Sequence, residues 1–180
     1  MRNDALPERL ERKTVYESDY ICLYTDKVKL PDGYVIEKYH QLHYPHEAVC
    51  VVIFNERDEI LMIHERRYTV GRLEWEVPAG KIEEGETAEE AVRREALEET
   101  GCTLKDLRHL CSQNPSHGMS DQVVQIFGAR VATEAEIMDI NEVAEKKWVS
   151  IDEAKHMLKH NETRDGISML AILYAFEYYR

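Results

Sequence analysis

The first part of the chain has the apolar spacing of β-strands. Residues 1–13 are charged and include Pro7, and we expect a short helix or a disordered arm there. From Val15 to Tyr44 the pattern predicts two or three antiparallel strands. The strand-like segments are 20–24, 26–30 and 34–40, with the turn Pro31-Asp32-Gly33 before the last. Such a small sheet cannot bury both faces alone, so it must pack on its own domain or on a second subunit.

The middle of the chain contains a longer and more apolar strand. Residues 46–54 form a continuous apolar run, and the polar turn 56–59 separates it from the apolar residues 60–63. This arrangement predicts a hairpin at the centre of the fold. Residues 73–77 alternate between apolar and polar types, which indicates a strand that leads into the loop at Pro78.

After residue 102, strands alternate with loops, and two helices close the chain. Strands are predicted at 107–111, 122–131 and 146–150. The segment 150–160 opens with a capping Ser150 and has Glu153 three residues later, which is typical of a helix start. A final helix is predicted over 165–179, because its large apolar residues recur at near-helical intervals.

The helix predicted over 88–99 is unusual because acids occupy its apolar face. Thr87 and Glu90 form a capping-box signature, and Gly101 supplies the expected stop. At about 100° per residue, the face of Ala91 and Val92 also carries three carboxylates. These are Glu95, Glu98 and Glu99. Inward carboxylates one turn apart repel one another and lose hydration, so a bound divalent cation would stabilise them.

The loop before this helix fits the same site. Hard cations such as Mg²⁺ take oxygen ligands, usually a few carboxylates together with substrate phosphates. Gly80 ends the segment 77–80 and allows the backbone to approach closely and to turn a carbonyl toward a metal. The alternative is that this Glu-rich helix is only a solvated surface.

Composition and charge narrow the class of protein. The 180 residues are 43% hydrophobic without a long apolar run, which favours one domain with an N-terminal extension. We expect no membrane span and no signal peptide, and therefore a cytoplasmic protein. The net charge of −12 would repel a nucleic-acid polymer, so no nucleic-acid partner is expected. The cysteines show no CxxC pairing, which suits reduced core thiols better than a zinc site or disulfides; they are Cys22, Cys50, Cys102 and Cys111.

The spacing of residues from the loop through the helix resembles the complete box of the Nudix hydrolases. The matching positions are Gly80, Glu86, Arg94-Glu95, Glu98-Glu99 and Gly101. The resemblance implies a loop-helix-loop that binds Mg²⁺ or Mn²⁺ and hydrolyses a nucleoside diphosphate linked to another group. By the same analogy Glu95, Glu98 and Glu99 hold the metals with help from the carbonyl of Ala79. Glu86 and Arg94 would pair and keep the junction in shape.

The N-terminal strands resemble those of the ADP-ribose pyrophosphatase and nucleotide-sugar hydrolase branch of this family. There the strands build a dimer and lend an aromatic residue to the partner's base pocket, which makes Tyr20 the first candidate and Tyr16 the second. The alternative for each is simple packing in the sheet. Arg67 occupies the position of a phosphate or ribose clamp in this branch, and a guanidinium fork suits bidentate phosphate contact. The alternative for Arg67 is a plain surface arginine.

Two later loops resemble functional loops of the same branch. The run Gly118-Met119-Ser120-Asp121 is similar to the loop that marks ADP-ribose pyrophosphatases, although Asp stands where Glu is commoner. It makes Ser120 and Asp121 candidates for substrate binding, with His117 as a further loop contact. In the segment 133–145, Glu142 best matches an acid that serves as a further metal ligand or general base. Glu145 is the second choice.

Together the residues and the resemblance imply a Nudix α/β/α sandwich with a mixed central sheet. Residues 1–44 would form an arm and a small antiparallel β subdomain for dimerisation and base binding, and residues 45–180 the hydrolase domain. The expected reaction is cleavage of the pyrophosphate of a nucleoside diphosphate sugar such as ADP-ribose, with metal ions lowering the pKa of a bound water. Glu142 or a box glutamate such as Glu98 would take the proton of that water.

Several alternatives stay open from the sequence. Within the hydrolases they are GDP-mannose or another nucleotide sugar, a dinucleoside polyphosphate, or a damaged nucleotide. Outside them, the fold could bind a nucleotide sugar without cutting it. An isopentenyl diphosphate isomerase is a further rival, but the complete box and the N-terminal strands fit it poorly.

Overall fold

The computed structural model describes residues 5–136 and 139–179 and divides the chain into two compact units. The small unit consists of Met1–His46 and Asn114–Gln122, and the large unit of Glu47–Gln113 and Val123–Arg180. Each unit has a sheet of its own.

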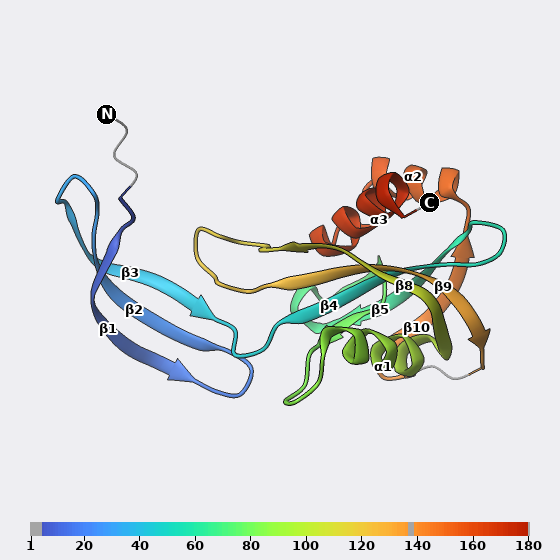
Figure 1. The fold of residues 1–180 in the computed structure, drawn as a ribbon, viewed down its shortest axis with the longest axis horizontal. Coiled ribbons are helices and arrows are strands. Elements are labelled where there is room, and N and C mark those ends of the chain that lie inside the picture. Colours follow the sequence, from blue (N-terminus) through green and yellow to red (C-terminus); the bar gives the residue numbers. More distant parts are fainter. Residues whose placement is uncertain (1–4, 137–138, 180) are drawn as a thin grey trace. The chain divides into compact units, whose positions relative to one another are not determined.

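The small unit is built on a three-stranded antiparallel sheet in the order β1-β2-β3 (Figure 1). Its strands are β1 (Glu8–Glu17), β2 (Cys22–Lys29) and β3 (Val35–His43). The expectation of a helix or disordered arm over 1–13 was wrong from Glu8 onward, and residues 1–4 lie outside the described part. All ten residues of β1 are exposed, so the strand lacks the apolar alternation by which a sequence reveals a strand.

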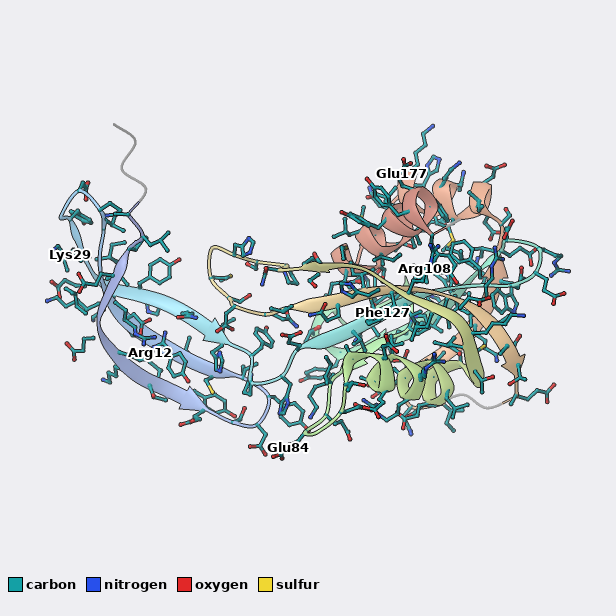
Figure 2. All side chains as sticks on the ribbon, viewed as in Figure 1. Arg12, Lys29, Glu84, Arg108, Phe127 and Glu177 are labelled. Carbon is teal, nitrogen blue, oxygen red and sulfur yellow. The ribbon has the colours of Figure 1, made fainter. Side chains whose placement is uncertain are left out.

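Polar contacts across the small sheet take the place of an apolar core. In β1, Arg12 donates from Nε and Nη2 to the two carboxylate oxygens of Asp26 at 2.8 and 2.7 Å. The same Nη2 donates to Gln41 Oε1 in β3 at 2.6 Å. The guanidinium, labelled in Figure 2, also lies 4.0 Å from the ring centroid of Tyr24. One arginine therefore connects all three strands. The predicted segments 20–24 and 26–30 form one strand, β2, which contains the buried Asp26.

The large unit contains a mixed sheet of seven strands, as expected. The path is β10-β5-β4-β9-β8, while β6 pairs with β5 and β7 pairs with β4. Only the β4–β9 pairing is parallel among the strand pairs of the described residues. The strands are β4 (Ala48–Phe54), β5 (Ile60–Arg67), β6 (Arg72–Glu76), β7 (Ala79–Lys81), β8 (Cys102–Gln113), β9 (Val124–Glu134) and β10 (Val143–Val149).

Helices cover both faces of this sheet. Figure 1 shows α1 (Ala88–Thr100) on one face, and α2 (Ile151–Lys159) and α3 (Gly166–Tyr178) on the other. A short 3-10 helix, η1 (Tyr68–Val70), follows β5. Alternate residues of β4 enter two different apolar clusters: Val49, Val51 and Ile53 pack with α1, and Cys50, Val52 and Phe54 pack with α2 and α3. Burial on both sides explains the continuous apolar run that marked this strand in the sequence.

The predicted central hairpin is present but short. The β4–β5 ladder contains only Phe54 opposite Ile60, and β7 pairs with Ala48–Cys50 on the same edge of β4, while β9 pairs along the opposite edge. The strand predicted at 107–111 extends over all of β8, which begins directly after α1. The helices expected at 150–160 and 165–179 are confirmed, with Ser150 and Asp165 as their capping residues.

Tyr179 anchors the end of the chain on the sheet. Its ring stacks on Phe54 at a centroid distance of 5.4 Å, and its hydroxyl donates to Asp106 O at 2.7 Å. A Cβ added to Gly128 in β9 would overlap this ring, so the close packing requires glycine there. The guanidinium of Arg108 lies over the same ring, 4.3 Å from its centroid. Together these contacts make Tyr179 part of the core beside α3.

Among the described residues, no helix combines the length and apolarity needed to cross a membrane. The four cysteines are free, as predicted, and Cys111 is the one of them that is partly exposed.

Candidate active site

The acidic helix α1 is fixed at both ends as the sequence predicted. Thr87 Oγ1 accepts a hydrogen bond from the Glu90 N–H, and the Glu90 carboxylate accepts one from the Thr87 N–H at 2.8 Å. Gly101 ends the helix in the left-handed conformation with φ of 70°. The apolar face packs on the sheet through Ala91, Val92 and Ala96. This anchoring sets the rotation of the helix, and therefore the direction of each acid.

The three box acids differ strongly in burial. Glu99 is 3% exposed. The side chain of Glu95 is 14% exposed, whereas that of Glu98 is 56% exposed. The expectation of three inward acids is therefore confirmed for Glu99, holds partly for Glu95, and is wrong for Glu98. Glu98 lies at the margin of the helix face, where the apolar contact with the sheet has ended.

The loop before the helix approaches these acids closely. The Ala79 N–H donates to Glu99 Oε2 at 3.2 Å. A Cβ built on Gly80 would lie only 2.0 Å from the carboxylate of Glu95, so any other residue there would force that carboxylate to move. The glycine therefore permits the loop and the helix to form one site. The predicted use of the Ala79 carbonyl as a metal ligand stays a prediction.

Arg94 joins the loop to the helix. Its Nε and Nη2 donate to the two oxygens of Glu86, each at 3.0 Å, which confirms the predicted pair. Nη2 also donates to the Lys81 carbonyl at 2.9 Å. Its Nη1 donates to Glu95 at 2.8 Å and to Glu98 at 3.1 Å. The hydrogen bonds from Arg94 lower the pKa of Glu86, so this pair is ionised and holds the loop in place.

A further buried acid, Glu65, lies at the end of β5 and was missed in the sequence. It is 5% exposed, and Arg67 Nη1 contacts its Oε1 at 2.7 Å. Its other oxygen, Oε2, is buried and has no hydrogen-bond partner within residues 5–136 and 139–179. The available signal was its spacing, because Leu61 and Glu65 are four residues apart in a strand and so share a face. In the sequence, however, Glu65 stands directly before Arg66 and Arg67, and such a run of charges is typical of a surface.

The predicted general base lies next to this acid. The Arg66 N–H donates to the carbonyl of Glu142 at 2.8 Å, and the Asp139 N–H donates to the carbonyl of Glu98 at 3.1 Å. The loop 139–142 therefore spans from the end of α1 to β5. The charge of Glu142 raises the pKa values of Glu65 and Glu99. Glu145, the second choice, lies farther along in β10, opposite His64.

Burial, with a smaller contribution from neighbouring charges, raises the pKa values of the acids in the site. Burial, then the charges of Glu65 and Glu95, raise the pKa of Glu99 well above its ordinary value, against a lowering hydrogen bond from Ala79. Burial also raises the pKa of Glu95, although Arg94 opposes this. For Glu65, burial raises the pKa to about 7 despite the adjacent Arg67. The site thus holds more negative charge than its own arginines neutralise.

The donor atoms suit a hard divalent cation. In the described part of the chain, no group of three or more His, Cys, Asp or Glu side chains is already drawn together closely enough to hold a metal. However, the carboxylates that repel one another are the oxygen ligands that Mg²⁺ and Mn²⁺ prefer, and the unpaired oxygen of Glu65 lacks a positive partner. The residues present therefore fit such a cation.

Arg67 connects the acids to a cleft. Its Nε and Nη2 donate to the carboxylate of Glu76 at 2.9 and 2.6 Å, while its Nη1 contacts Glu65. The adjoining cleft has a volume of about 350 Å³. Its charged lining consists of Arg67, Arg72, Glu74, Glu76, Arg164 and Asp165. Arginines in such a place can hold phosphate or ribose oxygens.

The predicted site residues fall into both units. Ala79, Glu95, Glu98, Glu99, Glu142 and Arg67 belong to the large unit, whereas Tyr20, Tyr16, His117, Ser120 and Asp121 belong to the small unit. Tyr20 is 74% exposed.

Within the small unit, the carboxylate of Asp121 pairs with the His43 ring at 2.6 Å and accepts from the Tyr44 N–H at 3.0 Å. These hydrogen bonds outweigh the effect of burial and lower the pKa of Asp121. Asp121 thus fastens the loop 114–122 to β3, and its role toward substrate stays a prediction.

Comparisons with known proteins agree with this geometry. The family model of the NUDIX domain matches residues 44–170. The chain is 32% identical to the ADP-ribose pyrophosphatase of Bacillus subtilis over 173 residues, covering 92% of each chain. It is 30% identical over 168 residues to a CMP-5'-(N-acetyl-N-hydroxy-3-aminopropyl)phosphonate hydrolase of Streptomyces rubellomurinus, covering 89% of this chain and 79% of that protein.

A solved structure supports the fold. The crystal structure of an ADP compounds hydrolase superposes with a TM-score of 0.87 over 99% of this chain and 96% of the other, at 20% identity. With the capped acidic helix, the glycine loop and the matching domain, the chain belongs to the Nudix family and is a Nudix pyrophosphohydrolase.

Proposed function

We propose that this protein is an Mg²⁺-dependent hydrolase that cleaves the pyrophosphate of a nucleoside diphosphate sugar such as ADP-ribose. The products would be a nucleoside monophosphate and a sugar phosphate. The observation that carries the proposal is the buried Glu99, whose charge is opposed by Glu65, Glu95 and Glu142 rather than neutralised. A buried anion in this setting is costly unless a cation joins it.

Different residues of the large unit would bind the metal and accept the proton. A bound divalent cation supplies charge neutralisation at the phosphoryl oxygens and a lowered pKa for water. Glu95, Glu98 and Glu99 would hold it, and Gly80 leaves room for their carboxylates against the loop. Glu142 is exposed beside this group and would accept the proton of the attacking water.

Arg67 would orient the substrate. Its guanidinium is held between Glu65 and Glu76, so little side-chain freedom is lost when it contacts a phosphate or ribose oxygen. The neighbouring cleft of about 350 Å³ carries two more arginines and would take part of the substrate. The relatives support the substrate class, because one is named an ADP-ribose pyrophosphatase and the other a hydrolase of a CMP-linked phosphonate.

A substrate panel tests the proposal. ADP-ribose, GDP-mannose, a dinucleoside polyphosphate and a CMP-linked phosphonate would be incubated with Mg²⁺, Mn²⁺ or EDTA, and phosphate release by a coupled phosphatase recorded. We expect metal-dependent cleavage that is fastest with a nucleoside diphosphate sugar. Tight binding of these compounds without any cleavage would instead identify a non-catalytic nucleotide-binding module.

We further propose that the protein is a homodimer formed through the small unit. Among the described residues of this unit only Cys22 and Asp26 are buried, and every residue of β1 is exposed. Three strands with so little buried apolar surface are marginal alone, and a second copy could cover them. Tyr20, or Tyr16, would then stack on the nucleotide base of the substrate bound in the partner's active site. Sedimentation equilibrium measures the mass, and a monomer at micromolar concentration would refute the proposal.

The roles of Tyr20, Ser120 and Asp121 in substrate binding are part of the same proposal. Replacing Tyr20 by Ala should raise KM about tenfold with little change in kcat, because base stacking contributes roughly 1–3 kcal/mol. Equal KM values for Tyr20→Ala and the wild type would restrict Tyr20 to packing.

A further inference from the structure

Glu65 lies on the inward face of β5, toward α1. Leu61 packs in the apolar cluster that contains Ala91, Val92 and Ala96 of α1. In a strand without a bulge, residues two and four positions later share the same face, and the β5–β6 ladder runs without a register shift through Glu65. The next inward residue after Leu61 is Ile63, which is fully buried. Glu65 therefore continues an apolar stripe into the acidic site.

The carboxylate of Glu65 is held by one oxygen only. Arg67 Nη1 contacts Oε1 at 2.7 Å, whereas Oε2 is buried with no hydrogen-bond partner in the described ranges 5–136 and 139–179. An unpaired buried oxygen of a carboxylate is costly, and such groups are rare in folded proteins. The arrangement fixes the direction of the side chain and leaves one oxygen available to a cation or to water.

Glu65 lies close enough to the box acid Glu99 to act on it electrostatically. The charge of Glu65 is the largest electrostatic cause of the raised pKa of Glu99, after burial. The backbone bond between Arg66 and Glu142 places the loop of the proposed base directly beside Glu65. Strand β5, helix α1 and the loop 139–142 thus bring carboxylate-bearing residues into the same region, although Glu65 lies outside the box.

A purely structural role for Glu65 explains only part of these contacts. Glu65 could serve simply as a counterion of Arg67, but Glu76 already provides Arg67 with two hydrogen bonds at 2.9 and 2.6 Å. A counterion role would also leave Oε2 without a function and would not account for its placement beside Glu99 and Glu142.

We propose that Glu65 is a further carboxylate of the metal centre, with Arg67 holding Oε1 so that Oε2 faces the cation or a water bound to it. The inference rests on the proposed function, because it assumes the cation held by Glu95, Glu98 and Glu99. It adds a residue from β5 to a site that the sequence analysis built from the loop at Ala79, the helix over 88–99 and Glu142. Arg67 would accordingly couple substrate binding to metal binding through Glu65.

Metal binding without substrate tests this proposal directly. The full-length protein and Glu65→Gln would be titrated with Mn²⁺ alone, by calorimetry and by the loss of the free Mn²⁺ signal in electron paramagnetic resonance. We expect the affinity to fall about 10-fold to 100-fold, the range for the loss of supporting carboxylates at metal sites. The metal-free Glu65→Gln protein should melt at the same or a higher temperature, because one of several repelling charges is gone.

Glu59→Gln is the matched control. Glu59 precedes β5, about 20 Å along the strand from Glu65 at 3.3 Å per residue, and it pairs with Asn55 and Arg57. The substitution removes one charge without touching the acidic site, so Mn²⁺ affinity should stay at the wild-type value. If Glu65→Gln folds poorly, Glu65→Asp retains the charge but withdraws the oxygen, and it should also bind Mn²⁺ more weakly.

The outcomes separate this inference from the proposed function. If Glu65→Gln, or Glu65→Asp in its place, binds Mn²⁺ like the control while Glu99→Gln loses it, Glu65 is only a structural counterion and the inference fails. If Glu99→Gln also binds Mn²⁺ like the wild type, the metal site of the proposed function fails as well. A selective loss in the Glu65 variant, with Glu59→Gln unchanged, supports the inference.

Discussion

Both units of the chain bury carboxylates, but the two units treat the negative charge in opposite ways. In the small unit, two hydrogen bonds from Arg12 lower the pKa of Asp26, against the effect of burial. In the large unit, burial and neighbouring acids raise the pKa values of Glu99 and Glu65. Arg12 neutralises the first carboxylate within its own sheet, whereas the arginines of the large unit do not fully offset the charges of the other two.

This difference separates a structural acid from a functional one. A carboxylate with a bidentate arginine stabilises the fold and gains nothing from a ligand. Carboxylates that are held together against their mutual repulsion reduce stability, and proteins retain such strain chiefly at functional sites. Substitutions should therefore affect folding in the small unit and chemistry in the large unit.

Replacing Glu99 by Gln should have the largest effect. It removes a charge beside Glu65 and Glu95, so the fold and the metal-free melting temperature should be retained. Loss of several kcal/mol of transition-state stabilisation corresponds to a fall in kcat of roughly 10³-fold. Steady-state kinetics at saturating Mg²⁺ measures this, and near wild-type turnover would remove Glu99 from the mechanism.

Replacing Gly80 by Ala should have the next largest effect. The new Cβ would occupy the position of the Glu95 carboxylate, so either the loop or the acid must move. A displacement of about 1 Å at a reacting site can reduce the rate roughly 10²-fold. Turnover and Mn²⁺ affinity should fall together, and Gly118→Ala, where a Cβ meets nothing, provides the matched glycine control for folding.

Replacing Asp26 by Asn tests the structural role of the carboxylate in the small unit. Arg12 would lose its charged partner across β1 and β2, which should destabilise the small sheet by about 1–3 kcal/mol. Hydrogen exchange of the strands 8–17 and 22–29 should accelerate, while Mn²⁺ affinity stays unchanged. A loss of Mn²⁺ binding in this variant would contradict the separation of the two roles.

The smallest effect is the pH dependence of the same pair. The folded pKa of Asp26 lies below its ordinary value of 3.8, so its contribution to the free energy of unfolding is complete above that value. The contribution disappears as the pH falls through the folded pKa, because protonation breaks the pair with Arg12. The stability difference between the wild type and Asp26→Asn should therefore be constant from pH 7 to about 4.5 and shrink below it, as urea unfolding can show.

The sequence predicted the helix α1 and its surroundings well because the signals there are local. The capping box at Thr87, the glycine after the helix and the pairing of Glu86 with Arg94 all depend on residues close in the chain. Strand β4 was also clear, since burial on both faces leaves an uninterrupted apolar run. Such features follow from short-range periodicity and chain stiffness.

The missed features depend on contacts between distant segments. Strand β1 is fully exposed, and what holds it is the bond of Arg12 to Asp26 and Gln41, 14 and 29 residues away. Glu65 was not singled out from the sequence, because its neighbours Glu99 and Glu142 come from distant segments of the chain. The exposure of Glu98 depends on how far the contact between α1 and the sheet extends around the helix. The spacing of apolar and polar residues within one segment does not determine any of these three features.

The seating of Tyr179 bears on how the protein can be handled in the laboratory. Because its ring packs against Gly128 and its hydroxyl donates to the Asp106 carbonyl, Tyr179 shields this part of the hydrophobic core from solvent. A series of progressively shortened chains should show an abrupt loss of soluble yield once this tyrosine is removed.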